Sequence, residues 1–220
     1  MLISRSLAAV VLLAIPMWAG ASLPGALPDD PPRVRPREAA SYDARDTHEG
    51  ITIAAEAYDS DEKIKAAFGN HDPRKFGVLP VYVVFFNTSK DALRLDALEI
   101  TLERGRERFP QIPAGEVSRR VNGFKAPNGV KPLKIKSPVS SIVDQEFLLK
   151  MVPSGQTAGG FVYFDGFSFP LTQGQDDTRI YLNKIHWAAS FRELMYFEIA
   201  FIDKSDTTKG GKDSKDTRKP

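Results

Sequence analysis

Ten residues from Val78 to Asn87, VLPVYVVFFN, decide the fold. Both alternating sets of side chains in this stretch are apolar, so the strand that it predicts needs packing on both of its faces. Pro80 should lie near the start of the strand, because proline has no amide proton to donate inside a sheet. The stretch therefore predicts a strand that is buried in the core of a β domain.

Further strands are predicted on either side of this stretch, where apolar residues alternate between turn signals. The segments expected to be extended are 51–58, 93–103, 160–164, 179–187 and 195–202. In 93–103 the alternation changes phase, and a β-bulge near Ala97 would keep both apolar sets on the core side. Short helices are expected at 63–68, at 113–121 and in the first half of 139–152. We expect a mainly β fold, an antiparallel sandwich.

The turn after the first strand carries Asn87-Thr88-Ser89, which matches the acceptor sequence for N-glycosylation. We interpret it as a turn instead. An Asn side chain tolerates left-handed backbone geometry and hydrogen-bonds to nearby backbone groups, which suits the first position of a tight connection.

Three blocks of sequence resemble a known class of domain. They read LPVYVVFFNTSKDALRLDALEITLE at 79–103, MVPSGQTAGGFVYF at 151–164 and YFEIAF at 196–201. Together they resemble the immunoglobulin-like β-sandwich domains of bacterial exported proteins of unknown function. The resemblance covers about 51–202 and implies an immunoglobulin-like antiparallel β-sandwich of about seven strands with one to three short helices. It implies no activity, because sandwiches host many functions and this family brings no catalytic motif.

The chain divides into four parts. Residues 1–21 have one basic side chain, an apolar stretch and small residues at the end, the pattern of a signal peptide. The apolar run is shorter than the roughly 20 residues that span a bilayer, so we expect cleavage and no membrane span afterwards. Residues 22–45 are proline-rich and are expected to be a linker. Residues 46–202 form the β-sandwich domain, and residues 203–220 are expected to be a disordered charged tail.

The composition argues against several kinds of chemistry. The 220 residues include no cysteine, which excludes disulfides, thiolate metal sites and a cysteine nucleophile. Thirty basic and 28 acidic residues leave a net charge of +2, so a nucleic-acid partner is not expected. His48, His71 and His186 lack the spacing of a metal site, so no metal or other cofactor is expected. No nucleophile elbow or phosphate loop occurs, and no catalytic residue is assigned.

Aromatic residues are densest in FVYFDGFSFP at 161–170. If their rings are exposed, Phe164, Phe167 and Phe169, together with Trp187, form a candidate patch for a ligand or partner. The alternative is that these rings close one end of the sandwich, because aromatic side chains are usually buried in such cores.

These features favour a non-catalytic binding or interaction module of the cell envelope. The protein would be exported to the periplasm or the extracellular space, and its partner would be an envelope protein or polymer. Binding would use loops at one end of the sandwich or an exposed strand edge. Two alternatives remain open. One is an envelope glycan hydrolase with paired carboxylates, for which the candidates are Asp165, Asp176, Asp177 and Glu193. The other is a carrier of a small ligand or metal through His71 or His186.

Overall fold

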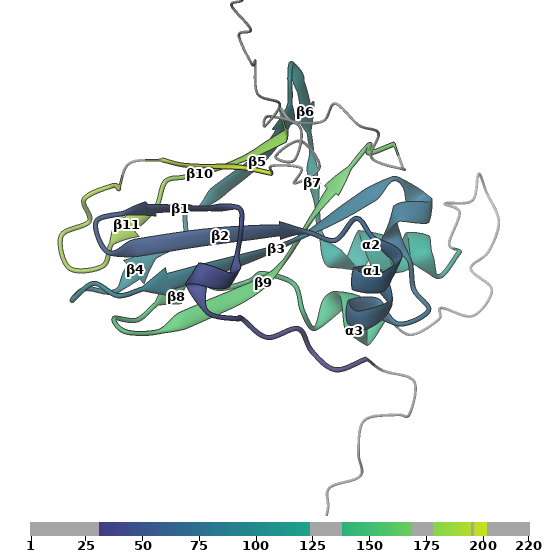
Figure 1. The fold of residues 1–220 in the computed structure, drawn as a ribbon, viewed down its shortest axis with the longest axis horizontal. Coiled ribbons are helices and arrows are strands. Elements are labelled where there is room, and N and C mark those ends of the chain that lie inside the picture. Colours follow the sequence, from purple (N-terminus) through teal and green to yellow (C-terminus); the bar gives the residue numbers. More distant parts are fainter. Residues whose placement is uncertain (1–30, 124–137, 169–177, 195, 202–220) are drawn as a thin grey trace, which may run out of the picture.

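The computed structural model of the chain describes residues 31–123, 138–168, 178–194 and 196–201. Within these ranges the fold is mainly β, with three antiparallel sheets and three short α-helices (Figure 1). This confirms the expected fold class. The strands are more numerous than the seven expected, because two predicted strands, 93–103 and 179–187, are divided between two sheets and four short strands were not predicted. None of the helices in the described ranges is long and apolar enough to cross a membrane.

The largest sheet has five strands in the order β1-β2-β3-β9-β7. Their bounds are Arg45–His48 for β1, Ile51–Ala57 for β2, Val78–Asn87 for β3, Thr157–Asp165 for β9 and Gln111–Ile112 for β7. The predicted bounds of β3 are confirmed, and all ten of its residues are buried. Pro80 is the third residue of β3, beyond the point where the β2 ladder ends at the Ala57–Val81 pair.

Two smaller sheets pack on one face of this sheet. One has the order β12-β10-β5-β6 and the other β11-β4-β8. Their bounds are Phe197–Ala200 for β12, Thr178–Asn183 for β10, Glu99–Arg104 for β5, Glu107–Phe109 for β6, His186–Trp187 for β11, Leu93–Arg94 for β4 and Met151–Val152 for β8. One apolar cluster fills the space between the sheets, with contributions from Val83, Leu102 and Ile180. The three sheets therefore share a sandwich core.

Helices cover the other face of the five-stranded sheet. They are α1 (Asp61–Phe68), α2 (Ala114–Val121) and α3 (Ser140–Val143), with short 3-10 turns η1 (Ala39–Ser41) and η2 (Pro73–Phe76). Phe68 and Val117 pack with Tyr82 and Phe161 in a second apolar cluster. This second cluster explains why both faces of β3 are apolar. The helices lie at one end of the molecule, on the right in Figure 1.

The phase change in 93–103 is a change of sheet, and the predicted β-bulge near Ala97 is wrong. A turn interrupts the strand, with Leu98 N donating to Leu95 O at 3.1 Å. The residues before this turn pair with β8 and β11, and those after it pair with β10. The segment 179–187 divides in the same way, at Lys184, whose φ is +58°. Each apolar set thus faces the same core from a different sheet.

Part of the proline-rich segment packs on the domain. Val34 N donates to Gln145 Oε1 at 2.7 Å, and Tyr82 Oη donates to Val34 O at 3.2 Å. Tyr42 belongs to the second apolar cluster. Residues 31–45, expected to be linker, therefore form an arm fixed to the helical side. The predicted signal peptide 1–21, residues 22–30 and the tail 203–220 lie outside the described residues.

Gly160 gives a prediction about stability. A Cβ atom there would lie 2.8 Å from Phe147 Cα, because residues around Phe147 run against β9: Phe147 N donates to Phe161 O at 2.8 Å. Gly160→Ala should lower the free energy of unfolding by about 2 kcal/mol, measured by urea denaturation. Gly115→Ala is the control, since a Cβ there meets nothing within 4 Å. Equal stability of the two variants would contradict the tight packing at Gly160.

Candidate functional site

Four connections between strands meet at one end of the sandwich. They are the turn between β1 and β2 at Glu49 and Gly50, residues 88–92 after β3, residues 153–156 after β8, and residues 188–194 after β11. This loop end lies opposite the helices, on the left in Figure 1. Loops at one end of the sandwich are one of the two kinds of surface expected for binding, the other being an exposed strand edge.

Asn87 ties two of these connections together. Its Nδ2 donates to Asp91 O at 2.8 Å and to Val152 O and Pro153 O, each at 3.1 Å. Its Oδ1 accepts from Ser89 N at 3.1 Å and from Ser89 Oγ at 2.6 Å. The residue is 1% exposed. This agrees with the interpretation of Asn87-Thr88-Ser89 as a turn, because every polar atom of the side chain is used inside the fold.

Further hydrogen bonds join the remaining connections. Thr88 N donates to Gly50 O at 2.9 Å, which ties the turn after β3 to the β1–β2 turn. Ser154 Oγ donates to Ser89 O at 2.6 Å. Ala188 N donates to Ala92 O at 2.8 Å. Each of the four loops therefore hydrogen-bonds to at least one other loop, and these bonds stabilise this end of the sandwich.

Phe191 projects from this braced end. Its side chain is 63% exposed, and its backbone has a φ of +56°. A bulky side chain in the left-handed region is rare and costs about 1–3 kcal/mol, so surrounding contacts must hold it there. Phe191 N donates to Trp187 O at 3.0 Å, and Trp187 N donates to Arg192 O at 2.9 Å. Strained backbone positions cluster at active sites, ligand clamps and switch regions, so Phe191 is a candidate site residue.

A row of outward-facing side chains, partly or fully exposed, continues from Phe191 across the three-stranded sheet. In the register of this sheet, Arg94 lies between His186 and Met151. The Arg94 guanidinium lies 4.7 Å from the centre of the Phe191 ring, and Met151 is 50% exposed. The neighbouring row, Trp187, Leu93 and Val152, is buried. Side chains alternate along a strand, so the first row faces away from the core.

One leucine extends the apolar surface. Leu95 N donates to Lys150 O at 2.8 Å, which continues the pairing of β4 and β8 by one residue. Alternation then places Leu149, which is exposed, on the same face as Met151. We call Phe191, Arg94, Met151 and Leu149 the loop-end patch.

The patch predicted from sequence lies elsewhere. Phe164, Phe167 and Trp187 are all buried in the sandwich core, and the Phe167 ring lies 4.0 Å from that of Phe109. Phe169 lies outside the described residues. The three described rings are therefore buried, as in the alternative to an exposed patch, and they pack in the core between the sheets. Sequence reasoning missed Phe191 because a single aromatic residue in a polar connection has no periodic signal.

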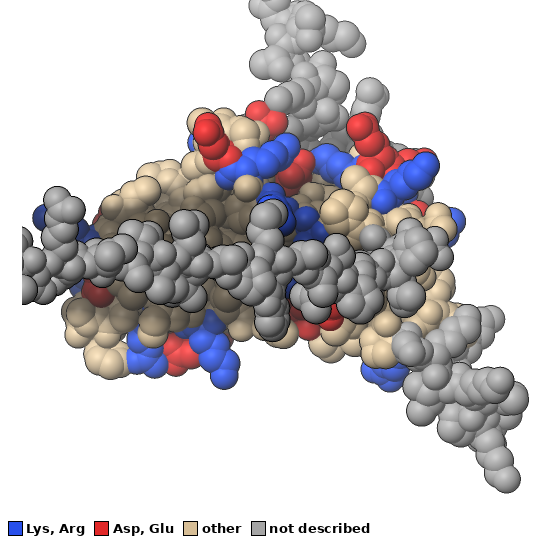
Figure 2. All heavy atoms as spheres, turned by 90° about the horizontal axis from the view of Figure 1, so that it is seen from below, with Lys and Arg blue, Asp and Glu red and all other residues tan. Residues whose placement is uncertain are grey.

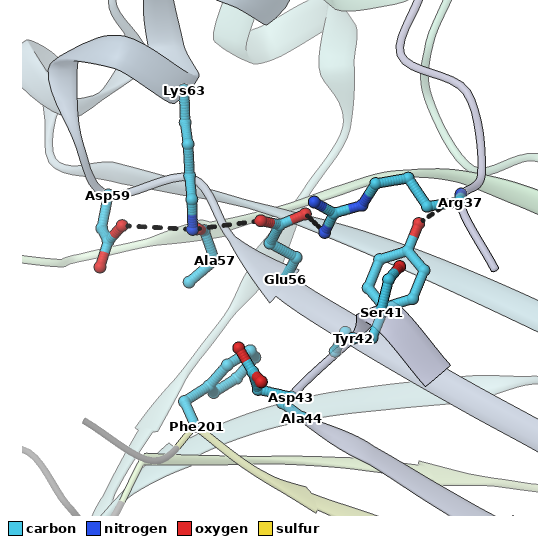
Figure 3. A pocket seen from close by; sticks show the side chains of 11 residues that line it. Arg37, Ser41, Tyr42, Asp43, Ala44, Glu56, Ala57, Asp59, Lys63 and Phe201 are labelled. Carbon is cyan, nitrogen blue, oxygen red and sulfur yellow. Dashed lines mark hydrogen bonds and ion pairs between the residues drawn. The ribbon is translucent and has the colours of Figure 1, made fainter. Parts of the chain in front are cut away.

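A charged network occupies a groove on the helical side. Glu56 lies between two cations, 2.8 Å from Arg37 Nη2 and 3.3 Å from Lys63 Nζ (Figure 3). Lys63 Nζ also donates to Ala57 O at 2.9 Å and lies 3.9 Å from Asp59. The groove has a volume of about 170 Å³. These four charged groups neutralise one another and join the arm and α1 to β2, so we assign the network a structural role.

Charged side chains elsewhere are paired in the same manner. On the face shown in Figure 2, lysines and arginines lie beside aspartates and glutamates around the rim. At the loop end, the hydrogen bond from Arg192 lowers the pKa of Glu49. Burial raises the pKa of Tyr58 and of Tyr82 far above the usual range, so these phenols stay protonated.

The two candidate carboxylates that the structure describes, Asp165 and Glu193, form contacts with different partners. Asp165 forms two hydrogen bonds with Arg120, at 2.7 and 2.9 Å, which lower its pKa. Glu193 lies 4.0 Å from His186 at the loop end. Asp176 and Asp177 lie outside the described residues.

The histidines are likewise separated. His48 hydrogen-bonds to Asp46 at 2.9 Å, and His71 lies in the turn after α1. Among residues that the structure describes, no three metal-ligating side chains gather into a site.

Comparisons with known proteins assign neither a family nor a function to the chain. No family model matches the chain, and no curated protein matches it significantly. Among solved structures it is similar to a protein described as a "putative lipoprotein (ycdA)" of Bacillus subtilis, with 14% identity and a TM-score of 0.37. The match covers 73% of this chain and 39% of the other, so the chain spans about two fifths of that protein's length. A likeness this distant carries no conclusion about activity.

Proposed function

We propose that this protein is a non-catalytic interaction module of the cell envelope that binds a protein partner through the loop-end patch. The observation that carries the proposal is Phe191, an exposed aromatic ring held on a strained backbone at a braced end of the sandwich. Export to the periplasm or the extracellular space follows from the signal-peptide pattern in residues 1–21.

The chemistry of the patch favours a protein over a polymer. Aromatic rings, methionine and arginine are the side chains enriched where proteins meet, and a few such residues supply most of the binding energy. Arg94 is neutralised by Asp96, with Nη2 2.7 Å from the carboxylate, so the patch offers an anionic polymer little net charge. A partner with an apolar centre would cover Phe191 and Met151 together.

The arrangement of loops also supports the immunoglobulin-like type of sandwich within this proposal. Domains of that type use loops at one end for recognition while the sheets serve as a rigid support. Here the hydrogen bonds of Ser89 to Asn87 and of Thr88 to Gly50 provide that support. A pre-organised surface binds more tightly, because less conformational entropy is lost when the partner arrives.

Capture from envelope extract tests the proposal. The mature protein would be cross-linked to extract at low and at physiological salt, and the adducts identified by mass spectrometry. We expect a protein that the wild type retains and that the double variant Phe191→Ser/Met151→Ser loses. Phe76→Ser is the matched control, because Phe76 is also exposed but lies in η2 at the helical side.

Two results would contradict the proposal. One is capture of anionic polymer alone, abolished by salt or by removal of residues 203–220, which would place binding in the tail. The other is an identical set of protein adducts from the wild type and the double variant, which would place binding on another surface. Retention of the partner by a chain lacking 203–220 would support the patch.

A further inference from the structure

We infer that the ion pair between Glu49 and Arg192 is a positioning device that holds Phe191 in its exposed, left-handed conformation. The inference deepens the proposed function, and it rests on that function for its claim that the conformation serves binding. Arg192 Nη1 lies 3.1 Å from Glu49 Oε1, and Nη2 binds Oε2. The two residues are 143 positions apart in the chain. Glu49 itself has a left-handed backbone, and Arg192 directly follows the left-handed Phe191.

Glu49 occupies a turn position for which glutamate is not a preferred residue. Glu49 has a φ of +49° and Gly50 of +81°, between paired residues His48 and Ile51. These angles match a two-residue type I′ hairpin, in which Asn or Asp normally precedes Gly. Glu lacks the short side chain that tolerates left-handed geometry. Its longer side chain instead reaches Arg192 in another loop.

Arg192 transmits this constraint to its neighbour. Its carbonyl oxygen accepts from Trp187 N at 2.9 Å, and its amide donates to Ser190 Oγ at 3.4 Å. The side chain is fixed by Glu49. Phe191 therefore lies between a backbone bond to Trp187 and a residue bound by Glu49, and both contacts favour its left-handed φ.

The ring is held by a second pair. Arg94 Nε and Nη2 bind the Asp96 carboxylate at 3.1 and 2.7 Å, which sets the guanidinium beneath the Phe191 ring. One ion pair thus acts on the backbone of Phe191 and another on its side chain. Both pairs are exposed, so each biases the loop rather than locking it.

Glu49→Asn tests the inference. Asn suits the hairpin turn better than Glu, so the fold should remain intact while the bond to Arg192 is lost. By NMR of the mature protein, the HN–Hα coupling and Cβ shift of residue 191 should move from left-handed towards extended values. We expect roughly a fivefold shift in the ratio of the two conformations, since exposed pairs have small coupling energies. The exchanged pair Glu49→Arg/Arg192→Glu should restore the wild-type values.

Glu99→Asn is the matched control. Glu99 binds Lys184, which is also exposed and also left-handed, but this pair lies outside the patch. The signals of residue 191 should be unchanged in this variant. If residue 191 keeps its left-handed signature in Glu49→Asn, the positioning role is overturned. If the signature shifts but partner capture is the same, the positioning role stands and the proposed function of the patch is overturned.

Discussion

Asn87→Asp should lower the free energy of unfolding by about 3 kcal/mol or more. The amide nitrogen of Asn87 faces three carbonyl oxygens, those of Asp91, Val152 and Pro153. A carboxylate oxygen in its place has no proton to donate and would repel all three. The residue is almost fully buried, so water cannot replace the lost hydrogen bonds. The change keeps the shape of the side chain, so the loss measures hydrogen bonding rather than a cavity.

Urea denaturation of matched variants measures this effect. Asn70→Asp is the control, because Asn70 is exposed in the turn after α1 and should change stability by less than about 0.5 kcal/mol. Ser89→Ala should fall between the two, since it removes one hydroxyl donor to Asn87 Oδ1. If Asn87→Asp were as mild as Asn70→Asp, the turn after β3 would not be the brace described above.

Phe191→Ser should weaken the partner's affinity about a hundredfold, close to 3 kcal/mol, as expected for a central aromatic anchor of an interface. The same variant should leave the free energy of unfolding nearly unchanged, because an exposed ring contributes little to the core. Phe191→Gly should raise the free energy of unfolding by about 0.5–1 kcal/mol, because glycine adopts a positive φ without strain. A residue that reduces stability where it stands, yet is needed for binding, marks a functional site.

Titration of the purified partner by calorimetry, with unfolding measured on the same samples, checks both parts of this prediction. Phe76→Ser should bind like the wild type, because Phe76 has an ordinary backbone φ and lies in η2, just before the start of β3, whereas the loop end follows the end of β3. A lower free energy of unfolding in Phe191→Gly would show that the Phe191 side chain stabilises the fold, and it would contradict the second part of the prediction.

The buried strand was predictable because its signal is local. Both alternating sets of residues in Val78–Asn87 are apolar, and two apolar clusters account for the two faces. The helix at 113–121 was also predicted within one residue, since Pro113 can start a helix without an amide donor. At α1, Ser60 caps the helix through Lys63 N, so the helix begins at Asp61, two residues before the predicted 63–68. Neighbouring cap residues of similar chemistry differ too little for sequence to separate them.

The change of sheet was not predictable from one segment. The phase change at Ala97 is a turn between two strands, β4 and β5. The partner segment turns as well, at Lys184, so that β4 pairs with β11 in one sheet and β5 pairs with β10 in the other. A bulge and a sheet change give the same local pattern of apolar residues. Only the pairing of segments distant in sequence distinguishes them.

The candidate site could not be predicted from the sequence for a similar reason. The exposure of Phe191 depends on a left-handed backbone, and that backbone depends on contacts with Trp187 and with distant Glu49. The dense aromatic run gave the stronger sequence signal, but its position between the sheets places Phe164 and Phe167 in the core. Aromatic density reports burial as readily as binding.

Site-specific photo-cross-linking tests the central claim most directly. A benzophenone analogue of phenylalanine would replace Phe191 in one sample of the mature protein and Phe76 in another, and both would be irradiated in envelope extract. We predict one protein adduct from position 191 that is absent from position 76 and unaffected by salt. No protein adduct from position 191, or the same adducts from both positions, would contradict the assignment of the loop-end patch as the surface that binds the partner.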